Sequence, residues 1–510
     1  MIPYANLKPD TKTYAVFWFP CYYKKYPIES GVMRYKFKFK PYEHQLEALK
    51  KSWKQKEFAY FMDMGTGKSK VLIDNMCVLY DRGAITGALI VAPKGVYRNW
   101  EQGELPTHIP DHVMYDTVLW NPSQTKTQLE KQKILFVTDD NLKIFIMNIE
   151  AFSTKKGCAM AESFVNSHKC LLAVDESTTI KSKDAKRTKS IVKIGKNAHY
   201  RRILTGSPVT KSPMDLYTQC EFLDPWLLGH SSYFSFQYEY AVVQRRTMGA
   251  HSFNQVVGYR NLDKLNGVLE KFSFRVKKED CLDLPDKVYI KRSVELTDEQ
   301  KSVYSSLKTF ALAMLEEGSV TTDTILTQLL RLQQVCSGHV KMDDGVMKTF
   351  NSAKLPELMS ALEETDDKVI IWANFTHDIK TIRNAIAEKY GEESVATYYG
   401  ETESDDRQDI VNSFQDPDSS LTYFVGQPRT GGYGLTLTQA KTVIYYSNNF
   451  DLEIRLQSED RAHRIGQTSK VTYIDIVAED TVDERILKAL RNKINIASQV
   501  LAEDFRDWIV

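Results

Sequence analysis

The sequence predicts an α/β protein with two tandem domains, each built on a parallel β-sheet. Short, wholly apolar runs alternate with helix-length segments, a pattern typical of strands in a parallel sheet that helices cover on both faces. The alternation occurs twice, once between Pro41 and Gln328 and again after Lys354. A chain of 510 residues is also too long for a single hydrophobic core. Two α/β domains are therefore the economical interpretation.

The apolar runs also indicate how the chain is divided. In the first half, the candidate strands are 88–92, 143–147, 171–174 and 203–204. In the second half, they are 368–374, 421–426, 442–447 and 471–478. We expect residues 226–350 to be mainly helical, because Thr297 to Gln300 match a capping box that opens a helix. The expected organisation is a small aromatic-rich N-terminal element at 1–36, a first α/β domain at 37–225, a helical insertion at 226–350, a second α/β domain at 351–480 and a C-terminal bracing helix at 481–510.

Composition is that of an ordinary soluble globular protein. The formal net charge of +1 leaves a nucleic-acid partner open, because a phosphate-binding groove needs only local positive charge. No apolar run approaches the ~18 residues of a membrane span, and the first residues lack the basic start of a signal peptide. The seven cysteines are scattered without C-x-x-C spacing, which favours a reducing compartment and argues against structural zinc. We therefore expect a cytoplasmic protein with no membrane partner.

A glycine loop joins an apolar strand to a helix within Phe58 to Lys70. Gly65 and Gly67 let the backbone curl so that N–H groups face an anion at the helix N-terminus. Lys68 would reach the outer phosphates of a nucleotide, and the Ser69 hydroxyl would ligate Mg²⁺. Only the second half of the pattern G-x-x-x-x-G-K-[ST] matches, since Met62 occupies the first glycine position. The alternative is a glycine turn before an ordinary helix, but the order of strand, loop and helix favours a phosphate loop.

Two further sets of charged residues suit phosphoryl transfer. Asp175 and Glu176 follow an apolar strand, where Asp175 would hold Mg²⁺ and Glu176 would deprotonate the attacking water. Arg461 and Arg464 are three residues apart, so on a helix they share a face and could stabilise charge on a transferring γ-phosphate. Because the arginines lie in the other α/β domain, catalysis would require the two domains to close. A second glycine run at 430–435 has no lysine after it, so we expect one nucleotide site per chain.

Seven stretches, in this order, resemble the Swi/Snf family of superfamily-two helicase-like ATPases. They are PYEHQ (41–45), DMGTGKS (63–69), LIVAPKGVYRNW (89–100), VDES (174–177), LTGSPV (204–209), TGGYGLTLTQA (430–440) and QSEDRAHRIGQ (457–467). DRAHRIGQ is highly specific to that family, and the resemblance covers roughly residues 37–500. It implies two RecA-like domains.

The resemblance also implies residue roles. The nucleotide-binding residues would be Gln45, as the adenine-reading glutamine, with Gly65, Thr66, Gly67, Lys68, Ser69, Gln457 and Gly434. The catalytic residues would be Lys68, Asp175, Glu176, Arg461 and Arg464, with Ser69 and Asp175 as the Mg²⁺ ligands. The DNA backbone would lie against Pro93, Lys94, Arg98, Asn99, Arg429, Thr430, Gly431 and Gly432. Gly431 and Gly432 would allow close approach to phosphates, which a side chain would obstruct.

The implied function is ATP-dependent, Mg²⁺-dependent translocation along duplex DNA without regard to base sequence, which would remodel DNA or protein–DNA complexes. The process is left open among DNA repair or recombination, replication restart and displacement of bound proteins. One alternative is a helicase that separates strands or migrates branches at forks and junctions. Another is an ATP-gated nucleic-acid clamp without productive hydrolysis, because Ser177 and Thr178 stand where the family usually has Ala-His. Thr436 likewise replaces a common Asn. With no recognisable accessory domain, the chain is similar to prokaryotic or viral members, which favours a monomer in the cytoplasm of a prokaryotic or virus-infected cell.

Three segments carry weaker expectations. Residues 181–202 hold nine lysines and arginines against one acid, Asp184, and we expect DNA backbone contact in preference to a merely solvated helix face. The apolar positions from Val482 to Leu501 predict an amphipathic helix that packs across the domains. The aromatic N-terminus is expected to be a packed lid, with a junction-reading wedge as the alternative.

Overall fold

The computed structural model describes residues 35–123, 125–209, 212–248, 251–281, 284–316, 322–342, 345–403, 406–431 and 435–492. The predictions for the N-terminal element and for the last turns of the C-terminal helix lie outside these residues. Contacts divide the chain after Phe37, and from Lys38 onward it forms one compact unit. No helix in this described part is long and apolar enough to cross a membrane.

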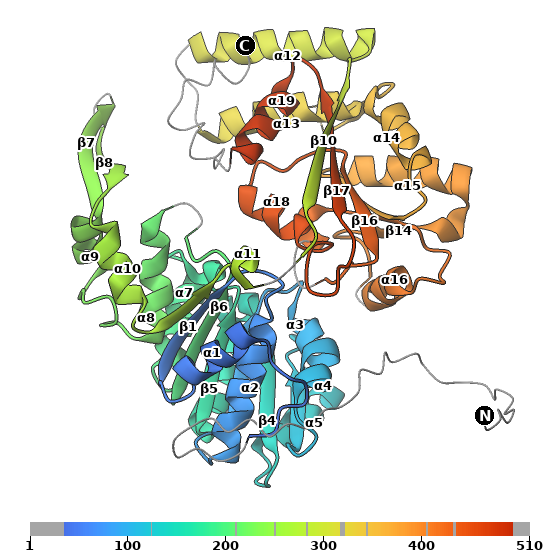
Figure 1. Cartoon of the computed structure of the whole chain (residues 1–510). Helices are drawn as coiled ribbons and strands as arrows, with labels where there is room; N and C mark the ends of the chain where they lie inside the picture. Colours follow the sequence, from blue (N-terminus) through green and yellow to red (C-terminus); the bar gives the residue numbers. More distant parts are fainter. Residues whose placement is uncertain are drawn as a thin grey trace, which may run out of the picture. The chain divides into compact units, whose positions relative to one another are not determined.

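The first domain is built on a seven-stranded sheet in which every pair of neighbours is parallel (Figure 1). In spatial order its strands are β3 (Tyr115–Leu119), β4 (Leu142–Asn148), β2 (Gly87–Ala92), β5 (Cys170–Asp175), β6 (Tyr200–Thr205), β1 (Glu57–Met62) and β9 (Ser273–Val276). Its helices are α1 (Glu43–Ser52), α2 (Lys68–Asp81), α3 (Tyr97–Asn99), α4 (Leu105–His108), α5 (Lys126–Lys133), α6 (Lys155–Ser167), α7 (Lys186–Gly195), α8 (Leu216–Leu223), α9 (Tyr233–Tyr240), α10 (Leu262–Leu269) and α11 (Lys278–Cys281).

The second domain is built on a six-stranded sheet that is also wholly parallel. In spatial order its strands are β10 (Lys287–Val294), β17 (Val471–Ala478), β16 (Ala440–Tyr445), β13 (Lys368–Trp372), β15 (Tyr423–Gly426) and β14 (Val395–Tyr398). Its helices are α12 (Asp298–Glu316), α13 (Thr322–Ser337), α14 (Lys354–Glu363), α15 (Thr376–Tyr390), α16 (Asp406–Gln415), α17 (Pro428–Gly431), α18 (Leu452–Glu459) and α19 (Val482–Arg491). The prediction of two parallel-sheet α/β domains is confirmed.

Central strands are mainly apolar because both sheet faces are covered. On β13, Ile370 and Trp372 belong to one core cluster with α16, whereas Val369 and Ile371 belong to another with α14 and α15. Side chains alternate between faces along a strand, so two clusters on one strand mean two covered faces. Within each sheet the parallel strands run in one direction, so their carboxyl ends lie at one edge. The site residues lie at that edge.

The range predicted as a helical insertion, 226–350, is more varied than expected. β9 and β10 join the first and second sheets respectively, and β7 (Ala241–Met248) pairs with β8 (His251–Tyr259) in a separate antiparallel hairpin. A second small hairpin joins β11 (His339–Lys341) to β12 (Met347–Thr349). The segment between β9 and β10 is thus the connection between the two sheets.

The paired helices α12 and α13 belong to the second domain. Tyr304, Leu329 and Leu332 share a core cluster with Val482 and Ile486 of α19. The described part of the C-terminal helix therefore packs on this helical pair and on the end of β17.

Candidate functional site

The glycine loop has the shape that its sequence predicts. Gly65 and Gly67 have φ of 77° and 88°, a region that favours glycine. Helix α2 begins directly after Gly67, and this N-cap residue makes no side-chain hydrogen bond to the first turn. The N–H groups of that turn therefore remain available to an anion, and the 14-residue helix favours negative charge there.

Two side chains of α1 hold the loop in place. The carbonyl oxygen of Thr66 accepts hydrogen bonds from Gln45 Nε2 at 3.0 Å and from His44 Nε2 at 2.8 Å. A Cβ at Gly67 would lie 2.2 Å from Gln45 Nε2, so any larger residue would have to displace this amide in addition to adopting a φ of 88°. Gln45 also accepts a hydrogen bond from the backbone N–H of Tyr42 at 3.0 Å. Here Gln45 is a loop-holding residue, and His44 is a partner that sequence reasoning missed.

Asp175 is the last residue of β5, and each of its carboxylate oxygens accepts a hydrogen bond. Trp100 Nε1 donates to Oδ2 at 3.0 Å, and the backbone N–H of Glu176 donates to Oδ1 at 3.0 Å. Burial raises the pKa of Asp175, whereas the Lys68 ammonium and these hydrogen bonds oppose the rise. Trp100 is fully buried, so it fixes the orientation of the carboxylate.

Glu176 has a left-handed backbone, with φ of 49° and ψ of 60°. This conformation is costly for a residue with a Cβ, and such strain clusters at functional sites. Burial raises the pKa of the Glu176 carboxyl to about 7, and the Lys68 ammonium opposes the rise. A carboxyl with that pKa can accept a proton near neutral pH, as a general base must.

The two arginines of the second domain face the glycine loop. A Cβ at Gly65 would lie 2.8 Å from Arg464 Cβ, so the loop and this residue are in close contact. Arg461 Nη2 lies 3.3 Å from Met64 Sδ, and both guanidinium groups donate to the carbonyl of Leu435 at 3.1 Å. The two predicted arginines thus lie beside Met64 and Gly65, in the loop that leads to Lys68.

One cavity of about 430 Å³ collects these groups. Of the residues predicted for the nucleotide site, its wall contains Gln45, Gly65, Gly67, Lys68, Ser69, Asp175, Glu176, Arg461 and Arg464. Its volume suits a small-molecule ligand. The Ser69 hydroxyl and the Asp175 carboxylate are hard oxygen donors on this wall, which fits a Mg²⁺ ion beside a triphosphate. The uncapped N-terminus of α2 fits the phosphates themselves.

Other predicted site residues lie elsewhere or serve differently. Asn99, expected at the DNA, lines the nucleotide cavity and donates to Glu104 Oε1 at 3.3 Å. Gln457 lines a neighbouring cavity of about 1130 Å³, where its Nε2 donates to Glu453 Oε1 at 3.1 Å. Gly431 packs on the Trp372 ring, which a Cβ would approach to 2.7 Å. Packing on Trp372 is therefore enough to require glycine at position 431, without any approach of DNA.

The remaining candidates for DNA contact are split. Lys94 and Arg429 are exposed, Arg98 and Thr430 are half-buried, and Pro93 is buried. Gly432 and Gly434 lie outside the described residues.

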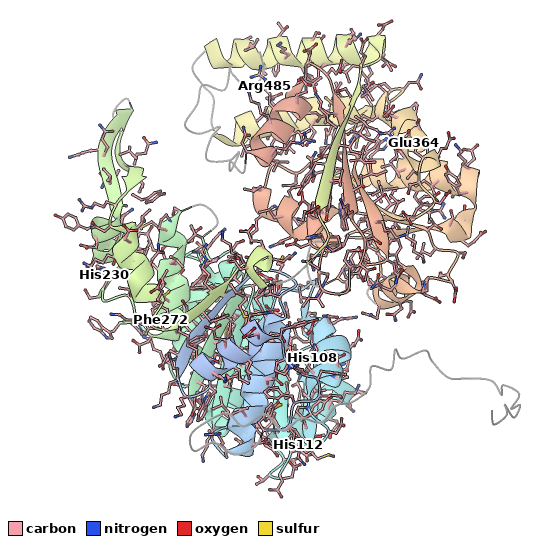
Figure 2. The ribbon with its side chains drawn as sticks, viewed as in Figure 1. His108, His112, His230, Phe272, Glu364 and Arg485 are labelled. Atoms are coloured by element: carbon pink, nitrogen blue, oxygen red, sulfur yellow. The ribbon has the colours of Figure 1, made fainter. Side chains whose placement is uncertain are left out.

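Glu104 enters the cavity although the sequence did not single it out. Its carboxyl accepts a hydrogen bond from Ser69 and faces the Arg464 guanidinium, while burial raises its pKa. His108, one turn later and labelled in Figure 2, has Nε2 3.8 Å from Glu104 Oε2. A short π-helical segment, Trp100–Glu104, precedes α4 and carries both Trp100 and Glu104 toward the site. Such segments often occur at functional sites.

Ser177 and Thr178, the residues that depart from the usual Ala-His, both have partners. Ser177 Oγ donates to Gln219 Oε1 at 2.6 Å, and Gln219 Nε2 donates to the carbonyl of Pro208 at 2.8 Å. Thr178 hydrogen-bonds Glu453 of the second domain. The carboxylate strand is thus linked to the loop after β6 on one side and to α18 on the other.

An ion network on the connecting segment joins the two domains. The backbone N–H of Lys278 donates to Asp63 Oδ2 at 3.0 Å, and its ammonium lies 2.5 Å from Asp460 Oδ1. Lys287 lies 2.9 Å from Glu459 Oε2. Because Asp460 precedes Arg461, this network fixes the arginine segment against the loop that leads into Gly65.

The basic segment 181–202 divides into two parts. Arg202 is fully buried in β6, and Arg201 pairs with Glu57 at 2.7 Å. On α7 and just after it, exposed lysines at three- and four-residue spacing form one stripe: Lys186, Lys189, Lys193 and Lys196. The stripe suits contact with a nucleic-acid backbone, whereas the buried Arg202 and the paired Arg201 do not.

Comparison with known proteins identifies two family models along the chain. The SNF2-related domain matches residues 45–340, and the helicase conserved C-terminal domain matches residues 352–466. The chain is 25% identical over 458 residues to a probable ATP-dependent DNA helicase of Arabidopsis thaliana, covering 86% of this chain and 39% of the relative. It is 26% identical over 451 residues to an uncharacterized ATP-dependent helicase of Mycoplasma genitalium, covering 87% and 40%.

Among solved structures, the chain is similar to the Sulfolobus solfataricus SWI2/SNF2 ATPase core in complex with dsDNA. That similarity has a TM-score of 0.42 and 24% identity, and it covers 93% of this chain and 96% of the other. The chain thus spans about two fifths of the length of these two curated relatives. The resemblance seen in the sequence motifs is confirmed at the level of the family.

Proposed function

Because the chain belongs to the family defined by the SNF2-related domain, we propose that it is a DNA-dependent ATPase that couples hydrolysis to translocation along duplex DNA. The observation that carries the proposal is the cavity whose wall joins Lys68 and Asp175 of one domain to Arg461 and Arg464 of the other. Two relatives are named as ATP-dependent helicases, one of them a DNA helicase.

The residues of the cavity suit distinct tasks in the hydrolysis of ATP. The loop N–H groups and Lys68 would hold the β- and γ-phosphates, and Glu176 would orient and deprotonate water. Arg461 and Arg464 would neutralise charge as it moves toward the leaving group. When bound, Mg²⁺ would be held by Ser69 and Asp175 and would supply further charge neutralisation.

Translocation follows if the hydrolysis state changes how the domains contact each other. The Lys278 network and the contact between Gly65 and Arg464 both bridge the two sheets, so nucleotide entry beside Gly65 would alter the bridge. Each domain would track the phosphate backbone, and base sequence would matter little.

The test is ATP turnover by the purified chain with and without blunt duplex DNA. Lys68→Ala and Glu176→Gln are each expected to lower duplex-stimulated hydrolysis at least about 100-fold. Lys156→Ala, on the exposed start of α6, is the matched control and retains the wild-type rate. Full activity in the Lys68 or Glu176 variant would refute the site.

The nucleic acid that stimulates turnover separates the alternatives. Blunt duplex should stimulate more than a single strand of the same length if the chain follows duplex DNA. Greater stimulation by single strands would favour a strand-separating helicase. Nucleic-acid binding with ATP but without phosphate release would favour the clamp.

A further inference from the structure

The β7–β8 hairpin is a two-stranded ribbon outside both sheets. Figure 1 shows it extending beyond α9 and α10, and among the described strands it pairs with no other. Its eight-residue first strand corresponds to a length of about 26 Å. A two-stranded ribbon is only marginally stable by itself, and this one adds no strand to either sheet. Its retention therefore points to a function outside core formation.

The base of the ribbon is firmly held. Tyr240 and Ala241 belong to the core of the first domain, where the His230 ring, labelled in Figure 2, lies 5.5 Å from the Tyr240 ring. Arg260, directly after the ribbon, donates through Nε to the carbonyl of Glu239 at 3.2 Å, and Asn261 Nδ2 donates to the same carbonyl at 2.9 Å. The ribbon therefore leaves the domain in a fixed direction.

The charge of the ribbon has one sign. Residues 241–260 contain three arginines and a histidine but no aspartate or glutamate. The nearest acid at its base, Glu239, is paired with Lys264 at 2.7 Å. Along the strands, Arg245 is exposed and Val257 is 47% exposed. Among the ribbon side chains that the structure describes, 241–245 and 254–259, none is acidic, and Arg245 beside exposed valines suits a polyanion that also has apolar faces.

Helix α9, at the foot of the ribbon, presents two aromatic rings to solvent. Phe234 and Tyr238 are four residues apart and share one helix face, and they are 72% and 78% exposed. Each ring has a cation near it: Lys183 Nζ lies 5.8 Å from the Phe234 centroid, and Arg260 Cζ lies 5.4 Å from the Tyr238 centroid. Exposed rings interleaved with cations are the composition of surfaces that stack unpaired bases and hold phosphates.

We infer that the β7–β8 ribbon and the exposed face of α9 form an arm that binds the unpaired strand of branched DNA. Lys183 lies in the basic segment before α7, so the arm continues from the lysine stripe that suits duplex backbone. Duplex DNA offers no base faces, because its bases are stacked on one another, whereas an unpaired strand does. The inference rests on the proposed function and adds to it a preference for forks.

The test compares binding to a blunt duplex with binding to a fork that has the same duplex and two unpaired arms. Fluorescence anisotropy gives Kd for each DNA at one salt concentration. Wild-type protein is expected to bind the fork more tightly than the blunt duplex. The double variant Phe234→Ala/Tyr238→Ala is expected to weaken fork binding about tenfold or more, since each stacked ring is worth that much. Its affinity for blunt duplex should stay as in wild type.

Phe310→Ala is the matched control, because Phe310 is also exposed, at 53%, but lies on α12 of the second domain. It should leave both affinities unchanged. Equal affinity of wild type for fork and duplex, an unchanged fork affinity in the double variant, or an equal loss on both DNAs would each overturn the inference. ATP turnover on blunt duplex, measured in parallel, tests the proposed function separately. Its absence in wild type refutes that function, and its presence with unchanged fork binding refutes only the arm.

Discussion

Replacing Trp100 by phenylalanine tests whether the orientation of Asp175 controls metal use. The indole N–H is 3.0 Å from Asp175 Oδ2, in a place where both residues are buried. A hydrogen bond to a charged group contributes about 1.5–3 kcal/mol, equivalent to about 10- to 100-fold in an equilibrium constant. Without this donor the pKa of Asp175 rises further, and more of the carboxyl is protonated and free to turn. We expect the Mg²⁺ concentration for half-maximal ATP turnover to rise by about tenfold or more.

Trp372→Phe provides the matched control. Trp372 is also fully buried, but its Nε1 has no hydrogen-bond partner among the described residues. Both substitutions remove the same atoms from a core, so both should lower the free energy of unfolding by about 1–3 kcal/mol. Only Trp100→Phe should shift the Mg²⁺ titration. Identical titrations for the two variants, with both proteins folded, would refute the role assigned to the Trp100 hydrogen bond.

Three other perturbations have definite expected outcomes. Burial raises the pKa of Glu176 to about 7, so kcat/KM for ATP should fall about tenfold per pH unit below that value. A flat profile from about pH 8 to about pH 6 would contradict the role of Glu176 as general base. Ser177→Ala removes the hydroxyl that donates to Gln219 and should lower the stimulation of ATP turnover by duplex DNA about 3- to 10-fold, while basal hydrolysis persists. An unchanged ratio of stimulated to basal rate would show that the Ser177–Gln219 hydrogen bond does not couple DNA to hydrolysis. Arg202→Leu leaves four backbone carbonyls without their buried donor and should cost about 3 kcal/mol or more in denaturant unfolding; a loss below about 1 kcal/mol would mean that water replaces the guanidinium.

Strands at the centre of each sheet could be predicted, whereas those at the edges could not. The run 471–478 was predicted as a strand, and β17 spans Val471–Ala478. All its positions except Thr472 are buried, so its sequence is mainly apolar, and its one charged residue, Asp475, pairs with Arg455. In contrast, β10 pairs only with β17 and leaves Tyr289 and Ile290 exposed, so its sequence mixes lysine with apolar residues. An edge strand is specified by its neighbour more than by its own pattern.

The site also contains residues that could be predicted from the sequence and residues that could not. Lys68 and Asp175 could be predicted because phosphate and metal chemistry demands those residue types next to a strand end. Trp100 and Lys278 could not, since their partners lie 75 and 182 residues away along the chain. Gly431 shows a third case. It was predicted to allow close approach to DNA phosphates, but its packing on Trp372 by itself requires glycine there.

The connecting segment explains how sites so far apart in sequence can act together. Lys278 ties Asp63, before the glycine loop, to Asp460, before the two arginines. Burial lowers the pKa of the Lys278 ammonium, and Asp460 opposes this, so loss of the contact would leave a charge in a desolvated place. Relative motion of the domains must therefore either keep this pair or let water in to replace it. Under the proposed function, a nucleotide that moved Arg464 away from Gly65 would act on the same bridge, and the segment between β9 and β10 would convert hydrolysis into relative movement of the domains.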